Sequence, residues 1–152
     1  MLQKLLAVTA IVTLPAGFAF AASHESDDSS GASMEMEITG DAEAGEQVFR
    51  KCQACHMVGE DAQNRVGPTL NGVVGRTAGT LEGFNYSDAM VAKGEEGLVW
   101  NPETLAAYLE NPRGYVEGTK MSFAGLRKEE ERANVIAYLA QYSEDGTMGE
   151  GS

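Results

Sequence analysis

Residues 52–56 read Cys52-Gln53-Ala54-Cys55-His56, and this stretch decides how the rest of the chain can fold. Two thiols separated by two residues, with an imidazole directly after the second thiol, form the pattern that attaches c-type haem to protein. Each thiol can close a thioether to one vinyl group of a porphyrin. His56 then lies beneath the iron, where a ring nitrogen can serve as the proximal ligand. The stretch therefore predicts one covalently bound haem c.

Three other uses of a Cys-x-x-Cys pair are open from the residues alone. A thioredoxin-like redox couple needs a hydrophobic strand before Cys52, and nothing there has the pattern of one. A zinc site is disfavoured because the chain has two Cys and two His, and His24 lies in a polar, Ser-rich stretch. An ordinary disulfide is the third alternative. Haem attachment is the favoured interpretation.

The first residues of the chain have the pattern of an export signal. Lys4 precedes an apolar run from Leu5 to Phe20, and the run ends in Ala19-Phe20-Ala21, a small-x-small pattern typical of signal peptidase sites. We therefore expect residues 1–21 to be a signal peptide and the protein to be periplasmic, where bacteria attach haem. The alternative is an uncleaved membrane anchor, because the run is about long enough to lie in a bilayer.

Composition divides the remainder of the chain into three parts. Residues 22–40 contain five acidic residues and no basic one, which predicts a disordered acidic tether. Residues 41–142 have the length and apolar content of one small domain. Residues 143–152 are rich in Gly and acids and are expected to form a flexible tail.

The domain is predicted to be all-α. Apolar residues recur at helical spacing, the connections are Gly-rich, and no pair of alternating strands is evident. A porphyrin in the middle would supply much of the core of so small a domain. The expected helices are 42–51 after the cap Asp41, a short one after Ser87, one after Asn101 with Pro102 at its first position, and about 128–142.

Sorting the seven Met residues by position selects the second iron ligand. Four of them lie in the leader, the tether or the tail, and Met57 lies directly beside His56, from where it cannot reach the opposite haem face. Met90 has the spacing of a helical core residue, which is the commoner role of Met. Met121 stands in the turn-rich segment Gly118-Thr119-Lys120-Met121 between two helices, which can fold over the porphyrin. Met121 is therefore the predicted ligand.

Residues 41–142 resemble the class I c-type cytochromes, close to the bacterial cytochrome c2 and mitochondrial carrier type. The resemblance implies a small cytochrome c fold in which Gly45, Phe49 and Tyr138 pack the first and last helices together. Besides the haem motif it rests on Gly67-Pro68-Thr69-Leu70-Asn71-Gly72, Gly75-Arg76-Thr77, Gly83-Phe84-Asn85-Tyr86, Trp100, Tyr108-Leu109-Glu110-Asn111-Pro112, Gly118-Thr119-Lys120-Met121, Phe123-Ala124-Gly125 and Ala137-Tyr138-Leu139.

The resemblance also implies roles for the residues around the haem. Pro68 would accept a hydrogen bond from the ring of His56 through its carbonyl, and Tyr108 would donate to the sulfur of Met121. Buried haem propionates need donors. The residues implied to surround them are Arg76, Tyr86, Trp100 and Thr119. For Trp100 and Tyr108 the alternative is an ordinary aromatic core role. Met90 departs from the mitochondrial pattern, which has Asn near a buried water.

The implied function is electron transfer, not enzymatic catalysis. Iron held by both His56 and Met121 has no vacant position for a substrate, and a thioether favours the ferrous state. We expect a monomeric carrier between a cytochrome bc1-type complex and a cytochrome c oxidase, a reaction centre or a reductase. The membrane would be reached only through these partners unless the leader is retained. The alternative is a peroxidase-like enzyme in which Met121 detaches.

Charge bears on the partners. The net charge of −12 gives no reason to expect nucleic-acid binding. The resemblance places six basic residues around the exposed haem edge, so that a basic ring would face acidic docking patches. The alternative is that these are merely solvated surface charges. The residues are Lys51, Arg65, Arg113, Lys120, Arg127 and Lys128.

Overall fold

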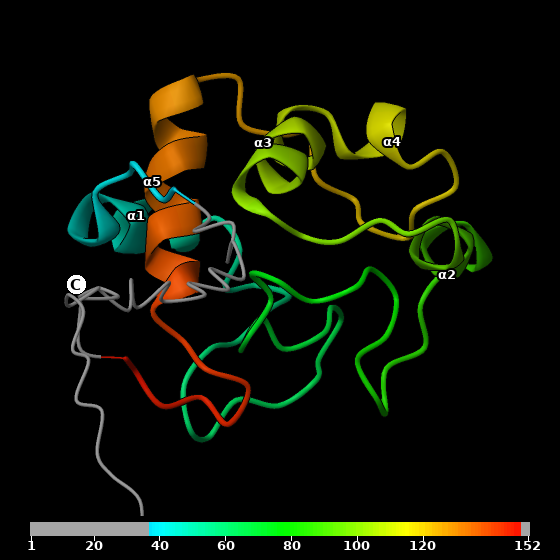
Figure 1. Ribbon diagram of the computed structural model, residues 1–152, viewed down its shortest axis with the longest axis horizontal. Coiled ribbons are helices and arrows are strands. Elements are labelled where there is room, and N and C mark those ends of the chain that lie inside the picture. Colours follow the sequence, from blue (N-terminus) through cyan, green and yellow to red (C-terminus); the bar gives the residue numbers. More distant parts are fainter. Residues whose placement is uncertain (1–36, 150–152) are drawn as a thin grey trace, which may run out of the picture. The chain divides into compact units, whose positions relative to one another are not determined.

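The computed structural model describes residues 37–149. These residues form five helices, and all but the third and fourth are separated by long irregular connections (Figure 1). Within this range the only β pairing consists of two isolated bridges, Thr77 with Val99 and Tyr142 with Met148. The predicted all-α class is therefore confirmed. The helices are α1 (Ala42–Phe49), α2 (Asp88–Glu95), α3 (Pro102–Glu110), α4 (Pro112–Tyr115) and α5 (Glu129–Ala140).

The predicted N-terminal caps are present at three helices. The Asp41 side chain accepts from the Ala44 N–H at 3.0 Å, and the Ser87 hydroxyl accepts from the Met90 N–H at 3.2 Å. Asn101 and Thr104 form a reciprocal capping box with bonds of 2.8 and 2.9 Å. Such caps satisfy backbone donors that have no partner inside the helix, so each fixes where its helix begins.

Helix ends differ from the prediction. The first helix ends at Phe49, not at Lys51, because the Lys51 and Cys52 N–H groups bond three residues back, to the carbonyls of Val48 and Phe49. This tighter turn begins the haem motif. The last helix is shorter at both ends than the predicted 128–142. Helix α4 was not predicted, and it is a single turn that starts at Pro112 after the cap Asn111.

Helices α1 and α5 cross in close contact (Figure 1). A Cβ at Gly45 would lie 2.0 Å from the Asn134 carbonyl oxygen, so the two backbones touch where Gly45 has no side chain. Beside this point the Phe49 and Tyr138 rings have centroids 5.3 Å apart. The expected packing of the first and last helices through these residues is confirmed.

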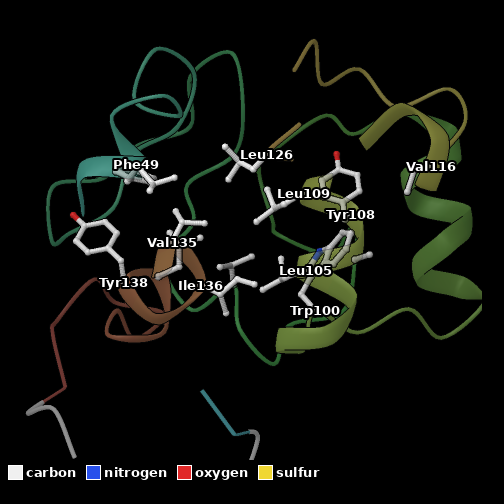
Figure 2. Close-up of a cluster of buried hydrophobic side chains, with 14 of the residues drawn as sticks. Phe49, Trp100, Leu105, Tyr108, Leu109, Val116, Leu126, Val135, Ile136 and Tyr138 are labelled. Carbon is white, nitrogen blue, oxygen red and sulfur yellow. The ribbon is translucent and has the colours of Figure 1, made fainter. Parts of the chain in front are cut away.

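The core continues from α5 to α3. Leu105 and Leu109 of α3 face Val135 and Ile136 of α5, and all four are buried (Figure 2). Burying one such aliphatic side chain stabilises the fold by about 1.5–3 kcal/mol. This layer supports Trp100 and Tyr108, whose ring centroids lie 5.0 Å apart. The helical core thus holds Trp100 and Tyr108, the two aromatic side chains to which the resemblance gives roles at the haem.

Residues 143–149 differ from the predicted flexible tail. They form a closed turn in which the Ser143 N–H donates to the Thr147 carbonyl at 2.9 Å and the Gly149 N–H donates to the Gln141 carbonyl at 2.8 Å. Gly146 lets the turn close, because its φ of +84° is a left-handed conformation that glycine adopts without strain. Composition alone shows only a Gly-rich segment, which is typical of a flexible tail. Residues 150–152 lie outside the described range.

The predicted leader, residues 1–21, and most of the predicted tether also lie outside the described residues. At the end of the tether, Gly40 already packs on α5, because a Cβ there would come within 2.1 Å of the Ala133 carbonyl oxygen. The next N–H, of Asp41, donates to the Asn134 side chain at 2.9 Å. Among residues 37–149, no helix has the length and apolar character needed to cross a membrane.

Candidate haem-binding site

The haem motif is wound into tight turns directly after α1. The Cys52 N–H donates to the Phe49 carbonyl at 2.7 Å, and the N–H groups of Cys55 and His56 both donate to the Cys52 carbonyl, at 3.0 and 2.9 Å. No disulfide joins the two cysteines, and both are partly buried. One helical turn thus carries both thiols and the imidazole, which is the local arrangement that attachment to a single porphyrin requires.

The state of Cys52 disfavours the redox-couple alternative. Burial raises the pKa of its thiol to about 11, although the charge of Lys51 acts in the opposite direction. A thioredoxin-like nucleophile needs a lowered thiol pKa. Residues 37–149 also contain no group of three His, Cys, Asp or Glu side chains that could hold a metal ion, and His24 lies outside this range. The geometry therefore gives no support to a zinc site.

The ring of His56 is fixed in one tautomer and one orientation. Its Nδ1 lies 2.7 Å from the carbonyl oxygen of Pro68, which can only accept, so Nδ1 carries the proton and Nε2 presents a lone pair. Burial lowers the pKa of the ring, which favours the neutral form that binds metal. A Cβ at Gly67 would lie 2.4 Å from His56 Cε1, so only glycine leaves room for the ring there.

The sulfur of Met121 is held from one side. The Tyr108 hydroxyl donates to Met121 Sδ at 3.2 Å and lies 3.3 Å from the Thr119 hydroxyl. The Met121 N–H also donates to the Thr119 oxygen at 3.3 Å. Burial raises the pKa of Tyr108, so the phenol keeps its proton and remains a donor. One thioether lone pair is used by Tyr108, and the other is available to a metal.

The four residues implied to bind propionates fall into two groups. Trp100 and Thr119 both contact Tyr108, Trp100 through its ring and Thr119 through its hydroxyl. Arg76 and Tyr86 form the other group, in which the charge of Arg76 lowers the pKa of the Tyr86 phenol while burial raises it more strongly. The two groups meet through backbone, since the Trp100 N–H donates to the Arg76 carbonyl at 2.9 Å.

Arg76 is tied to the loop that follows the haem motif. Its guanidinium donates to the Asn71 carbonyl at 3.0 Å and to the Thr69 carbonyl at 3.4 Å. Burial lowers the pKa of this guanidinium, and Tyr86 and Glu144 partly oppose that effect. Two bonds to carbonyls leave further N–H groups of the guanidinium to donate to a buried carboxylate.

The six basic residues proposed for docking are all exposed, but their surroundings differ. Lys51 pairs with Glu131 at 2.8 Å, and Lys128 approaches the same carboxylate at 4.0 Å. Lys120 donates to the carbonyls of Asn85 and Tyr86 at 3.1 and 2.9 Å. Arg65 makes one long contact, 3.5 Å, with the Gln53 carbonyl. Arg113 and Arg127 have no acidic partner within 4.0 Å among residues 37–149.

The site also uses residues to which the sequence analysis gave no role. Gly67 makes room for the His56 ring, and the buried side chain of Asn71 bonds to both the N–H and the carbonyl of Gly59, each at 2.9 Å. Both residues lie in the Gly-Pro motif that carries the resemblance, so the motif pointed to them without showing what they contact. Glu131 carried no signal, because it meets Lys51 only in the folded chain.

Comparison with known proteins agrees with this geometry. A family model described as Cytochrome c matches residues 42–143. Cytochrome c2 of Afifella marina is 55% identical over 103 residues, covering 68% of this chain and 83% of that protein. Cytochrome c-550 of Ancylobacter novellus is 53% identical over 103 residues, covering 68% of this chain and 96% of that protein. The solved structure of cytochrome c2 from Rhodospirillum centenum has a TM-score of 0.66 and 48% identity, covering 68% of this chain and 99% of that one.

The chain therefore belongs to the cytochrome c family, and within it to the class I type of cytochrome c2. It is a single-haem electron-transfer protein, not an enzyme. Its cofactor is one covalent haem c, for which Cys52 and Cys55 are the two cysteines of the chain. The neutral His56 ring and the oriented Met121 sulfur are donors of the kind that haem iron accepts, so the residues present fit this group.

Proposed function

We propose that the protein shuttles single electrons through the periplasm, from a quinol-oxidising complex of the cytochrome bc1 type to an oxidase, a reaction centre or a reductase. Cys52 and Cys55 carry the two thioethers, and His56 and Met121 are the axial ligands. One observation carries the proposal: each proposed ligand is already oriented by its own partner, His56 by the Pro68 carbonyl and Met121 by the Tyr108 hydroxyl.

The haem supplies a one-electron couple at its iron. His56, hydrogen-bonded through Nδ1, is a stronger donor in a fixed orientation. Met121 offers a soft thioether, which favours the ferrous state and raises the reduction potential. Because the Pro68 carbonyl holds His56 and the Tyr108 hydroxyl holds Met121, neither side chain needs to move when the iron changes its oxidation state. Trp100 and Tyr108, both buried, keep water from the Met121 side, which raises the potential further.

An absorption and redox study of the purified holoprotein tests the axial pair. We expect a ferric charge-transfer band from methionine to iron at neutral pH, and no binding of carbon monoxide by the reduced protein without denaturant. The Met121 sulfur accepts a hydrogen bond from the Tyr108 hydroxyl, which in turn contacts the Thr119 hydroxyl, and neither group is a distal acid or base of a peroxidase. Carbon monoxide binding by the native reduced protein, or absence of the band, would contradict the proposal.

The periplasmic location is supported by the signal-peptide pattern of residues 1–21. Mass spectrometry of the native protein distinguishes a cleaved leader from a retained anchor. We expect an N-terminus at or near Ala22, with residues 22–40 as an acidic tether. A mass that includes Leu5–Phe20 would instead support an electron carrier confined to the membrane surface.

The docking proposal gives different weights to the six basic residues. Lys51 and Lys128 share the carboxylate of Glu131, which offsets part of their charge. Arg113 has no such partner among residues 37–149, so its charge is available to an acidic patch on a redox partner. Steering by such charges makes the association depend on ionic strength. It also keeps the complex weak, as the turnover of a shuttle requires.

Reversal of one charge tests this. We expect Arg113→Glu to lower the second-order rate of electron transfer to the physiological oxidase by about tenfold at low salt, and to flatten its dependence on ionic strength. The matched control is Lys93→Glu, an equal charge change at a lysine that pairs with Glu96 at 2.6 Å and is outside the proposed docking set. If both variants slow the reaction equally, net charge alone is responsible and the docking assignment is wrong.

A further inference from the structure

Residues 141–149, which we name the C-terminal clasp, lie largely beyond the family match that ends at residue 143. Besides the two bonds that close the turn, the Asp145 carboxylate accepts from the Thr147 N–H at 2.9 Å and from its hydroxyl at 2.7 Å. Tyr142 forms an isolated bridge with Met148. The clasp is thus an ordered element that composition does not reveal.

The clasp is seated on the loop that follows His56, beside which it lies in Figure 1. Gly146 is buried, and a Cβ there would come within 2.2 Å of the Gly59 carbonyl oxygen and 2.7 Å of the Asn71 side-chain nitrogen. The Gly72 N–H donates to the Tyr142 carbonyl at 2.9 Å. These contacts fix the clasp relative to residues 69–72, whose Thr69 and Asn71 carbonyls also accept from Arg76.

Glu144 and Arg76 approach this segment together. A Cβ at Gly72 would lie 2.6 Å from Glu144 Cγ, so the Glu144 side chain covers Gly72. Arg76 donates to the carbonyl of Asn71, the residue before Gly72. Both side chains line one surface pocket of about 420 Å³, with Val74, Gly75 and Gln141 among its other walls. Among residues 37–149, no other acidic side chain lines this pocket.

We propose that the clasp positions the carboxylate of Glu144 beside Arg76, where it opposes the positive charge that Arg76 brings to the haem and lowers the reduction potential. This inference rests on the proposed function, in which Arg76 faces the haem propionates. A negative charge stabilises the oxidised haem, which carries one more positive charge than the reduced haem. At the iron, the negative potential of Glu144 also offsets part of the positive potential of Arg76. Because Glu144 is exposed, solvent and salt screen the effect and keep it modest.

The attraction also appears at Arg76 itself. Burial lowers the pKa of the guanidinium, and the charge of Glu144 acts against that decrease. Within the clasp, the Asp145 carboxylate is hydrogen-bonded to Thr147 and does not line the pocket. Glu144 is therefore the acidic residue that the clasp places near Arg76.

The test is the reduction potential of the holoprotein carrying Glu144→Gln, measured by spectroelectrochemistry at low salt. We expect the reduction equilibrium constant to rise about two- to threefold, which is a rise of about 18–28 mV at 59 mV per tenfold change for a one-electron couple. At high salt the shift should shrink. Glu144→Asp keeps the charge and should restore most of the wild-type potential.

The matched control is Glu60→Gln, which removes the same charge from an exposed acid that lines a different pocket, with Gly59, Thr147 and Met148. We expect it to shift the potential by less than a third as much. Gly146→Ala is a second, independent variant, because its Cβ cannot fit against Gly59 and should release the clasp with Glu144. It should raise the potential in the same direction and speed hydrogen exchange at the Gly72 N–H.

Equal shifts from Glu144→Gln and Glu60→Gln would overturn the proposal, as would a Gly146→Ala variant that frees the Gly72 N–H without raising the potential. These results leave the axial ligands untouched, since the charge-transfer band reports Met121 separately. Loss of the band from the wild-type protein, in contrast, would contradict the proposed function and not the position of Glu144.

Discussion

Met121→Ala is expected to remove the ferric charge-transfer band and to lower the reduction potential on the order of 0.2 V, within the span of about 0.8 V that axial ligands cover. The thioether is the group that favours ferrous iron, and its loss admits water or an external ligand with harder donors. Tyr108 would at the same time lose the acceptor that its hydroxyl contacts at 3.2 Å. Spectroscopy and redox titration of the same preparation measure both effects.

The control is Met90→Leu. Met90 is buried in α2 with 7% exposure, and its spacing predicted a core residue. A swap of Met for Leu conserves volume and is expected to cost less than about 1.5 kcal/mol in stability. The band and the potential should both be retained. If Met121→Ala leaves the band in place and Met90→Leu removes it, the ligand assignment is wrong.

Features that depend on neighbours in sequence were predictable. Asp41, Ser87 and Asn101 were recognised as caps because each bonds to an N–H group three residues ahead, a distance that a sequence pattern contains. Helix ends were less predictable, since the first helix ends at Phe49 through bonds from Lys51 and Cys52 to carbonyls three residues back, which no sequence pattern showed. The single turn of α4 is too short to show periodicity.

Features that depend on distant contacts were not predictable from composition. The clasp resembles a loose tail in sequence, yet Gly146 is buried against Gly59. The two glycines are separated in sequence by more than half the length of the domain. Likewise the pairing of Lys51 with Glu131 joins residues 80 positions apart, and it changes which docking charges are free. The contacts of His56 and Met121 with their partners were anticipated only because the family resemblance supplied the long-range information.

Gly45→Ala is expected to reduce the free energy of unfolding of the holoprotein by about 3 kcal/mol, the upper end of the usual range for overpacking. In an exposed helix the same change stabilises by up to about 1 kcal/mol, since alanine is the better helix former. Here the new Cβ would lie 2.0 Å from the Asn134 carbonyl oxygen and 2.8 Å from Tyr138 Cβ. The first obstacle is backbone, so α1 must move away from α5 and loosen the contact between Phe49 and Tyr138.

Equilibrium denaturation with guanidinium chloride measures the loss, with Glu46→Ala as the control one position along α1. Glu46 is exposed, so its replacement should change the free energy of unfolding by about 0.5 kcal/mol or less. Because α1 runs directly into the haem motif, the displacement in Gly45→Ala should also reach Cys52 and broaden the haem absorption bands. A Gly45→Ala protein as stable as Glu46→Ala would show that the two helices can separate at little cost, which the close approach of their backbones contradicts.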